Sequence, residues 1–147
     1  MSLISENQIR LDCGVKSKAE VIDLFVDLMY ESDKIKDKGL LKEEIYKRED
    51  LANTAIGDEI AIPHALSSEV TEAGLIFLRL KNPINWGNSE KVKYVFGIAV
   101  PKENKNNQHL KILSTLARNL MNEEFKDELL NSKNIKECFE ILNRIGV

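Results

Sequence analysis

The sequence is poor in the residues that mark several specialised classes of protein. Its 147 residues include two cysteines, two histidines and three prolines. Cys13 and Cys138 lie far apart in the chain and form no CxxC pair, so we expect two free thiols in a reducing compartment. No apolar run approaches the roughly 20 residues that span a bilayer, and the N-terminus lacks the cationic-then-apolar order of a signal peptide. These absences predict a cytoplasmic protein without direct membrane insertion.

The charges are mixed along the chain. The formal net charge is −3, and lysines are interleaved with aspartates and glutamates instead of forming a basic block. A basic patch is the usual footprint of a nucleic-acid-binding protein, so nucleic acid is not expected as a partner. The hydrophobic content of 43% and the charged content of 31% are typical of a globular protein. The length suits one domain, 1–147.

Motifs of several enzyme classes are also missing. The chain has no GxxxxGKS or GxxxxGKT phosphate loop, no GxGxxG after a strand, no GxSxG and no HExxH. No spacing of histidines and carboxylates favours a metal site, and neither a metal nor another cofactor is expected. The two histidines, His64 and His109, are therefore the strongest candidates for chemistry.

Hydropathy and turn residues predict strands mixed with helices. The expected elements are a strand at 8–13, a helix from Ser17 to about Glu31, a helix at 40–50, a short strand at 60–62 stopped by Pro63, strands at 74–80 and 93–100, a polar loop at 101–108, a helix from His109 that continues through 123–130, and a last helix at 134–145. The strand at 93–100 is almost entirely apolar, as a central strand covered on both faces should be. The pattern therefore predicts an α/β layered domain.

His64 has a setting that suits covalent chemistry. It directly follows Pro63 at the end of an apolar run, so the fixed φ of the proline stiffens the chain that leads to it. A neutral imidazole is nucleophilic near pH 7, and its nitrogen can accept a phosphoryl group. The alternative is a surface or capping histidine without a chemical role.

Two further residues have settings that suit an anion. His109 stands at the predicted start of a helix, where unpaired N–H groups and the helix dipole attract negative charge. Arg48, near the end of the predicted second helix, offers a planar guanidinium to phosphate oxygens. The alternatives are an ordinary first-turn histidine and an arginine that only complements the helix dipole.

Together these residues form a known pattern. The segments KRED (47–50) and NTAIGDEIAIPHA (53–65) resemble the motif of the fructose/mannitol-type IIA components of the bacterial sugar phosphotransferase system. The matching residues are Arg48, Glu49, Thr54, Ile56, Gly57 and the run Ala61-Ile62-Pro63-His64-Ala65. The resemblance extends through KSKAEVIDLFVDLMYESDKIKDK (16–38), VFGIAVP (95–101) and HLKILSTLARNL (109–120), in the family's order.

The resemblance implies a fold and a phosphoryl relay. The fold is a mixed parallel and antiparallel β-sheet flanked by helices on both sides. The phosphoryl group comes from the phosphohistidine of HPr and passes to a cysteine on a separate IIB component, which works with a membrane IIC component on a fructose- or mannitol-like sugar. The implied site residues are His64 as phosphoryl acceptor, His109 as a second active-site histidine, Arg48 as the group that steadies the phosphate, and Thr54, Glu49 and Pro63 as supporting residues of the motif.

The chain departs from the family at Glu59, where relatives often have glycine. If that position needs a positive φ, glutamate costs about 1 kcal/mol or more, and its charge is expected near the phosphate site. Three other functions stay open: a regulatory, nitrogen-type IIA protein, an interaction module with a decayed site, and a metal-dependent enzyme that uses both histidines.

Overall fold

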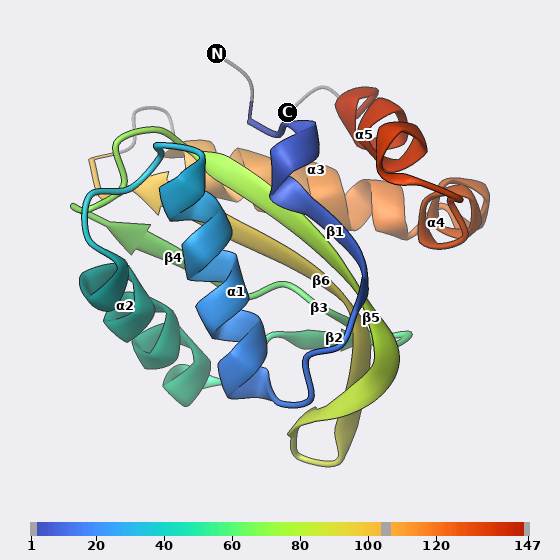
Figure 1. The fold of residues 1–147 in the computed structure, drawn as a ribbon, viewed down its shortest axis with the longest axis horizontal. Coiled ribbons are helices and arrows are strands. Elements are labelled where there is room, and N and C mark those ends of the chain that lie inside the picture. The colour runs from blue at the N-terminus through green and yellow to red at the C-terminus, as the bar shows by residue number, and fades with distance from the viewer. Residues whose placement is uncertain (1–2, 104–106, 146–147) are drawn as a thin grey trace.

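The computed structural model describes residues 3–103 and 107–145, which form a mixed sheet with helices on both faces (Figure 1). The strands are β1 (Ile9–Cys13), β2 (Ala55–Gly57), β3 (Ile60–Ala61), β4 (His64–Ser67), β5 (Gly74–Gly87) and β6 (Glu90–Pro101). The helices are the 3-10 turn η1 (Glu6–Gln8), α1 (Lys18–Glu31), α2 (Lys38–Leu51), α3 (Gln108–Leu120), α4 (Glu123–Leu130) and α5 (Ile135–Asn143). The predicted α/β layered fold is confirmed.

The sheet is built around the long β5–β6 hairpin. Its strand order is β1-β5-β6-β3-β2, and β4 also pairs with β6. β5 and β6 are antiparallel, whereas β1 runs parallel to β5. β3 and β4 both run parallel to β6, with Ile60 opposite Tyr94 and His64 opposite Ile98. The chain from β3 to β4 therefore follows one side of β6.

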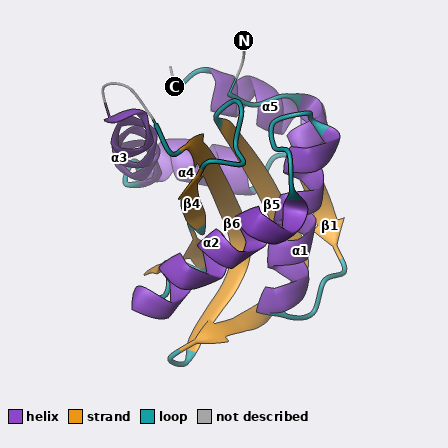
Figure 2. Ribbon diagram, turned by 90° about the vertical axis from the view of Figure 1, so that its left-hand side faces the viewer, coloured by secondary structure: helices purple, strands orange, loops and turns teal. Residues whose placement is uncertain are grey.

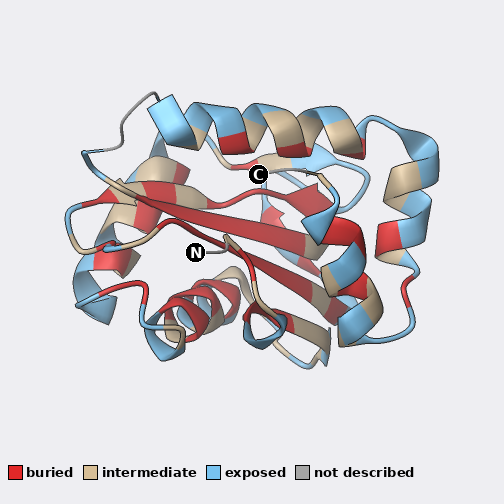
Figure 3. Cartoon of the chain, turned by 90° about the horizontal axis from the view of Figure 1, so that it is seen from above, coloured by how far each residue is buried: buried red, intermediate tan, exposed pale blue. Residues whose placement is uncertain are grey.

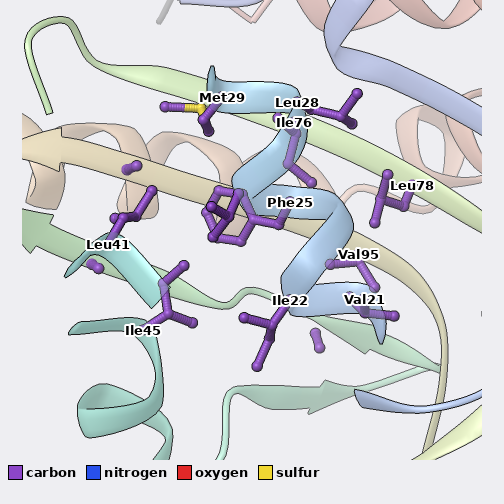
Figure 4. Packing of buried hydrophobic residues seen from close by; sticks show 14 of the residues in the cluster. Val21, Ile22, Phe25, Leu28, Met29, Leu41, Ile45, Ile76, Leu78 and Val95 are labelled. Carbon is purple, nitrogen blue, oxygen red and sulfur yellow. The ribbon is translucent and has the colours of Figure 1, made fainter. Parts of the chain in front are cut away.

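Side chains of β5 and β6 alternate between two hydrophobic layers, as expected when helices cover both faces of a sheet. On one side, Ile76 and Val95 pack with Phe25 of α1 and with Leu41 of α2 (Figure 4). On the other side, Phe77, Phe96 and Ile98 pack with residues of α3, α4 and α5. Figure 2 shows the strands between these helices, and Figure 3 shows that the long strands are mostly buried.

The prediction for Pro63 is partly wrong. The strand at 60–62 does end near the proline, but pairing with β6 resumes at the next residue, His64. The buried Pro63 keeps its carbonyl in the ladder, where it accepts from the Ile98 N–H at 3.0 Å. β4 has its ladder only with β6 among the described strands, so the missing proline N–H breaks no second ladder.

The helix predicted to run from His109 through 123–130 is two helices. α3 ends at Leu120, and Asn122 starts α4 by accepting the Phe125 N–H with its side chain. Apolar periodicity did not indicate this break, because the start of α4 depends on one local hydrogen bond between a side chain and the backbone. The predicted loop at 101–108 falls in part on 104–106, outside the described residues.

The sheet also has pairing that hydropathy did not predict. β2 and β4 are short, and the outer part of the β5–β6 hairpin is largely polar. The apolar residues in these segments are too few for hydropathy to identify a strand. Among the described residues, no helix has the length and apolar composition needed to cross a bilayer.

Candidate active site

His64 is the first residue of β4, and contacts to both ring nitrogens fix its imidazole. Its Nδ1 lies 2.8 Å from the Ile62 carbonyl oxygen, and Arg48 Nε lies 3.2 Å from its Nε2. A carbonyl can only accept and a guanidinium can only donate. Nδ1 therefore carries the proton, and Nε2 presents the lone pair. The neutral ring has one nucleophilic nitrogen, and it is the one beside Arg48.

The surroundings of His64 favour this neutral ring. Burial lowers its pKa below the ordinary value of about 6.5, and electrostatic interactions with Arg48 and His109 lower it further. The hydrogen bond to Ile62 and the charge of Glu49 act in the opposite direction, but the net shift is downward. The side chain is half-buried. At neutral pH the imidazole is uncharged and able to attack.

Arg48 lies in the last turn of α2 and binds in two directions. Its Nη1 donates to the carbonyl of Ala52, the C-cap residue of α2, at 2.8 Å. Its Nε points to His64. The arginine therefore satisfies the helix end, which was the plainer of its two predicted roles, and also contacts the candidate nucleophile. A guanidinium has five N–H donors, so this anchoring uses only part of its capacity.

The site opens into a cavity of about 600 Å³. Its walls come from α2, β4 and α3, three elements that meet at one end of the sheet (Figures 1 and 2). The lining residues are Glu44, Lys47, Arg48, Asp50, Leu51, His64, Ala65, Leu66 and His109. The fold therefore brings together the three residues that the sequence singled out, from positions 48, 64 and 109.

His109 is the second residue of α3, as its predicted position at a helix start required. The N-cap, Asn107, makes no side-chain capping bond to the helix. The first turn of this helix therefore brings N–H groups and the positive end of the dipole to the wall of the cavity that holds His64. Such a wall favours an anion in the cavity.

Glu49 and Thr54 occupy different positions from the other motif residues. Both are buried and neither lines the cavity. The Thr54 hydroxyl donates to one oxygen of the Glu49 carboxylate, and its N–H donates to the other at 3.3 Å. Lys18 and Trp86 also bind this carboxylate, at 2.7 and 3.2 Å. Sequence reasoning missed these two partners because no local pattern relates α1 or β5 to residue 49.

Glu59 has the strained backbone that its departure from the family implied. Its φ is 63°, and the preceding Asp58 has a φ of 55°. These two residues form the turn between β2 and β3, where a type I′ geometry requires positive φ at both positions. The charge is not beside the cavity, however. Glu59 precedes β3 and is absent from the cavity wall, about 16 Å along the strand direction from His64 at 3.3 Å per residue.

The comparison with known families identifies the chain. The family model "Phosphoenolpyruvate-dependent sugar phosphotransferase system, EIIA 2" matches residues 2–145. The "PTS system fructose-specific EIIABC component" of Bacillus subtilis is 34% identical over 144 residues, which are 97% of this chain. The chain spans 22% of the length of that relative.

Solved structures show the same fold. The nitrogen regulatory protein IIA-Ntr of Neisseria meningitidis superimposes with a TM-score of 0.85 at 28% identity, over 95% of this chain and 96% of that one. The IIA chain in a complex of enzyme IIAMTL with phosphorylated enzyme IIBMTL from Escherichia coli has a TM-score of 0.81 at 20% identity, over 96% and 97%. A complex of a IIA protein with phosphorylated IIB is thus known for a protein of this fold. Since the family model covers nearly the whole sequence and the fold agrees, the chain belongs to the EIIA type-2, fructose/mannitol family of the phosphoenolpyruvate-dependent sugar phosphotransferase system.

Proposed function

We propose that Nε2 of His64 accepts a phosphoryl group from phospho-HPr and passes it to a cysteine of a IIB component. The observation that carries this proposal is the fixed tautomer, which aims the lone pair of Nε2 at Arg48 and the cavity. A nucleophile, a fixed cation and a helix N-terminus are the equipment that phosphoryl transfer requires, because the reaction depends mainly on positioning and charge stabilisation.

The transfer involves one bond formed and one broken. Once Nε2 has exchanged the Arg48 Nε–H for phosphorus, its lone pair forms the new N–P bond while the N–P bond of the donor phosphohistidine breaks. The Nδ1 proton stays on the ring, where its bond to the Ile62 carbonyl persists. In the second transfer the IIB thiolate attacks phosphorus and His64 leaves as the neutral imidazole. No proton has to move at the nucleophile in either step.

Arg48 and His109 stabilise the phosphoryl oxygens in this proposal. The guanidinium is already held beside Nε2 by its bond to Ala52, so its Nε–H has only to exchange Nε2 for a phosphoryl oxygen during the reaction. His109 lies on the same cavity wall at the start of α3. Pro63, Thr54 and Glu49 act indirectly, because they hold the backbone that carries these groups.

The rim of the cavity supplies a docking face for both partners. Leu51 is 83% exposed and Leu110 is 54% exposed, and Leu51 and Leu66 line the cavity itself. Apolar residues around a nucleophile suit the small interface of a transient complex. We place the domain in the cytoplasm, in a relay that ends in uptake of a fructose- or mannitol-like sugar through separate IIB and IIC components.

A phosphorylation assay tests the proposal. The protein is mixed with phosphoenolpyruvate, enzyme I and HPr, and its intact mass is followed for wild type, His64→Ala and His109→Ala. We expect an acid-labile gain of about 80 Da, typical of a phosphohistidine, that only His64→Ala abolishes. If the wild type gains no mass while HPr is phosphorylated, the chain is an interaction module and the relay is excluded.

A regulatory role is the second candidate, because a nitrogen regulatory IIA protein shares the fold at 28% identity. In this role His64 would carry the same phosphoryl group, but the chain would control another protein. Transfer from the phosphorylated chain to a IIB cysteine supports transport. Binding of a target protein that changes with the phosphorylation of His64, without transfer to any IIB, supports regulation.

A further inference from the structure

One buried carboxylate outside the cavity wall has several hydrogen-bonding partners. Glu49 is 7% exposed, and its carboxylate accepts from the Lys18 ammonium, the Trp86 indole N–H, and the N–H and hydroxyl of Thr54. The Lys18 ammonium also donates to the Trp86 carbonyl at 3.2 Å and lies 4.9 Å from the centre of the indole ring. A buried charge is tolerated when it has this many partners, so Glu49 is held in one position.

A chain of hydrogen bonds leads from Glu49 to one nitrogen of the catalytic ring. The carboxylate holds Thr54 by its N–H and its hydroxyl. The Thr54 carbonyl accepts from the Ile62 N–H at 3.0 Å. The Ile62 carbonyl, at the other end of the same residue, accepts from His64 Nδ1 at 2.8 Å. Thr54 therefore fixes the backbone group that determines which nitrogen of His64 is protonated.

A second connection leads to the other nitrogen. Arg48 immediately precedes Glu49 in the last turn of α2. Its guanidinium binds the Ala52 carbonyl with Nη1 and His64 Nε2 with Nε. Ala52 stands between Glu49 and Thr54 in the chain, so the position of its carbonyl depends on how Glu49 and Thr54 close the loop. Both contacts to the imidazole thus start from the same buried carboxylate.

We propose that Glu49 is a positioning residue for phosphoryl transfer, which orients His64 by anchoring both the Ile62 carbonyl and the Arg48 guanidinium. It contacts neither the phosphoryl group nor the reacting nitrogen. This inference rests on the proposed function of His64, but the geometry that it predicts exists before any phosphoryl group arrives.

The first test replaces Glu49 with glutamine, which keeps the size of the side chain and removes its charge. In the wild type, ¹⁵N NMR of the His64 ring is expected to show a protonated Nδ1 and an unprotonated Nε2. In Glu49→Gln we expect a mixture of both tautomers. The rate constant for phosphoryl transfer at saturating phospho-HPr should fall about 10- to 100-fold, while KM for phospho-HPr changes less than about 2-fold.

The matched control is Glu43→Gln, which makes the same change in charge at an exposed position of α2 outside the cavity wall. It should leave the tautomer and the rate constant unchanged. If Glu49 only stabilised the fold, Glu49→Gln would lower the melting temperature but would change neither the tautomer nor the rate constant of the folded fraction. A wild-type tautomer and rate constant in folded Glu49→Gln would overturn the proposal.

A second pair of variants decides the question if Glu49→Gln does not fold. Thr54→Val removes the hydroxyl that binds Glu49, whereas Thr54→Ser keeps it. We expect Ser to retain the wild-type tautomer and Val to shift it in the direction of the mixture. Equal spectra for the two variants would overturn the proposal. Because the tautomer is measured without a donor, a wild type that fails to accept phosphate disproves the relay and leaves this test of Glu49 intact.

Discussion

At the residue scale, the chemistry of His64 depends on which ring nitrogen carries the proton. The Ile62 carbonyl can only accept and the Arg48 guanidinium can only donate, so the free protein already has the lone pair of His64 on Nε2, beside Arg48. A histidine in water has no such fixed tautomer. One backbone carbonyl and one guanidinium thus prepare the proposed nucleophile.

The lowered pKa of His64 gives a pH-dependent prediction. Protonated Nε2 cannot attack phosphorus. Phosphoryl acceptance should therefore persist below about pH 6.5, the ordinary histidine pKa. It should fall only as the pH drops through the lowered pKa of His64. Arg48→Gln removes a positive charge that lowers this pKa, so the acidic limb of its rate profile should lie at higher pH. Single-turnover transfer from phospho-HPr between pH 5 and 8 checks this. A limb that stays in place or moves to lower pH would contradict the assigned cause.

The same shift has a consequence for stability. Above about pH 6.5 residue 64 is neutral in both folded and unfolded chains, so its ionisation adds nothing to the free energy of unfolding. As the pH falls towards the lower folded pKa, only the unfolded chain binds the proton, and stability is lost. Urea titrations at pH 7.5 and 5.5 should show a smaller loss for His64→Gln than for wild type. Equal losses would mean that the folded pKa of His64 is not lowered.

At the element scale, the turn between β2 and β3 carries avoidable strain. Glu59 has a φ of 63° and its side chain is exposed. Glutamate in the left-handed region costs roughly 1 kcal/mol, and glycine removes that cost. Glu59→Gly should therefore raise the free energy of unfolding by about 1 kcal/mol, since Asp-Gly is also a preferred type I′ pair. Chemical denaturation measures this, and Glu59→Ala, which keeps the Cβ, should show no comparable gain.

Gly97 of β6 allows α1 to approach the sheet. A Cβ at this position would lie 2.8 Å from Ile76 Cγ1 and 2.9 Å from two ring carbons of Phe25. Because Ile76 and Phe25 are both fully buried, they have little room to move away from an added Cβ. Gly97→Ala should lower the free energy of unfolding by roughly 1–3 kcal/mol through overpacking.

The control for Gly97 is Gly14→Ala, where an added Cβ meets no atom within 4 Å. This variant should keep the wild-type midpoint in urea within error. If Gly97→Ala is as stable as Gly14→Ala, α1 does not pack on the sheet as closely as these distances indicate.

At the scale of the whole molecule, the proposed docking surface includes exposed residues beside the cavity that holds His64. Leu51 lines the cavity and is 83% exposed, so a partner that reaches His64 covers it. Leu51→Glu should raise KM for phospho-HPr by roughly five-fold, without a change in the maximal rate or in the melting temperature. Met121 is 81% exposed at the C-cap of α3 and outside the cavity wall. Met121→Glu should leave KM unchanged, and equal effects of both substitutions would exclude this docking face.

Much of the fold and the central residue of the site could be predicted from the sequence. Nearly continuous apolar runs identified the inner parts of β5 and β6, and helical spacing identified α1 and α5, because these elements bury their apolar side chains in the two layers of the core. His64, His109 and Arg48 stood out by their residue type and local setting. β2, β4 and the break at Asn122 were missed because pairing with β6 and a single cap, rather than apolar periodicity, define them.

The sequence by itself therefore determined the family, the layered fold and the candidate site residues, since these follow from residue type and short-range spacing. Only the tertiary structure decided which nitrogen of His64 is available and that Glu49 meets Lys18 and Trp86. These contacts join α1, α2, β4 and β5 across up to 37 positions of the chain, and no local pattern encodes a distance between such segments. Packing of both helix layers on one sheet sets that distance.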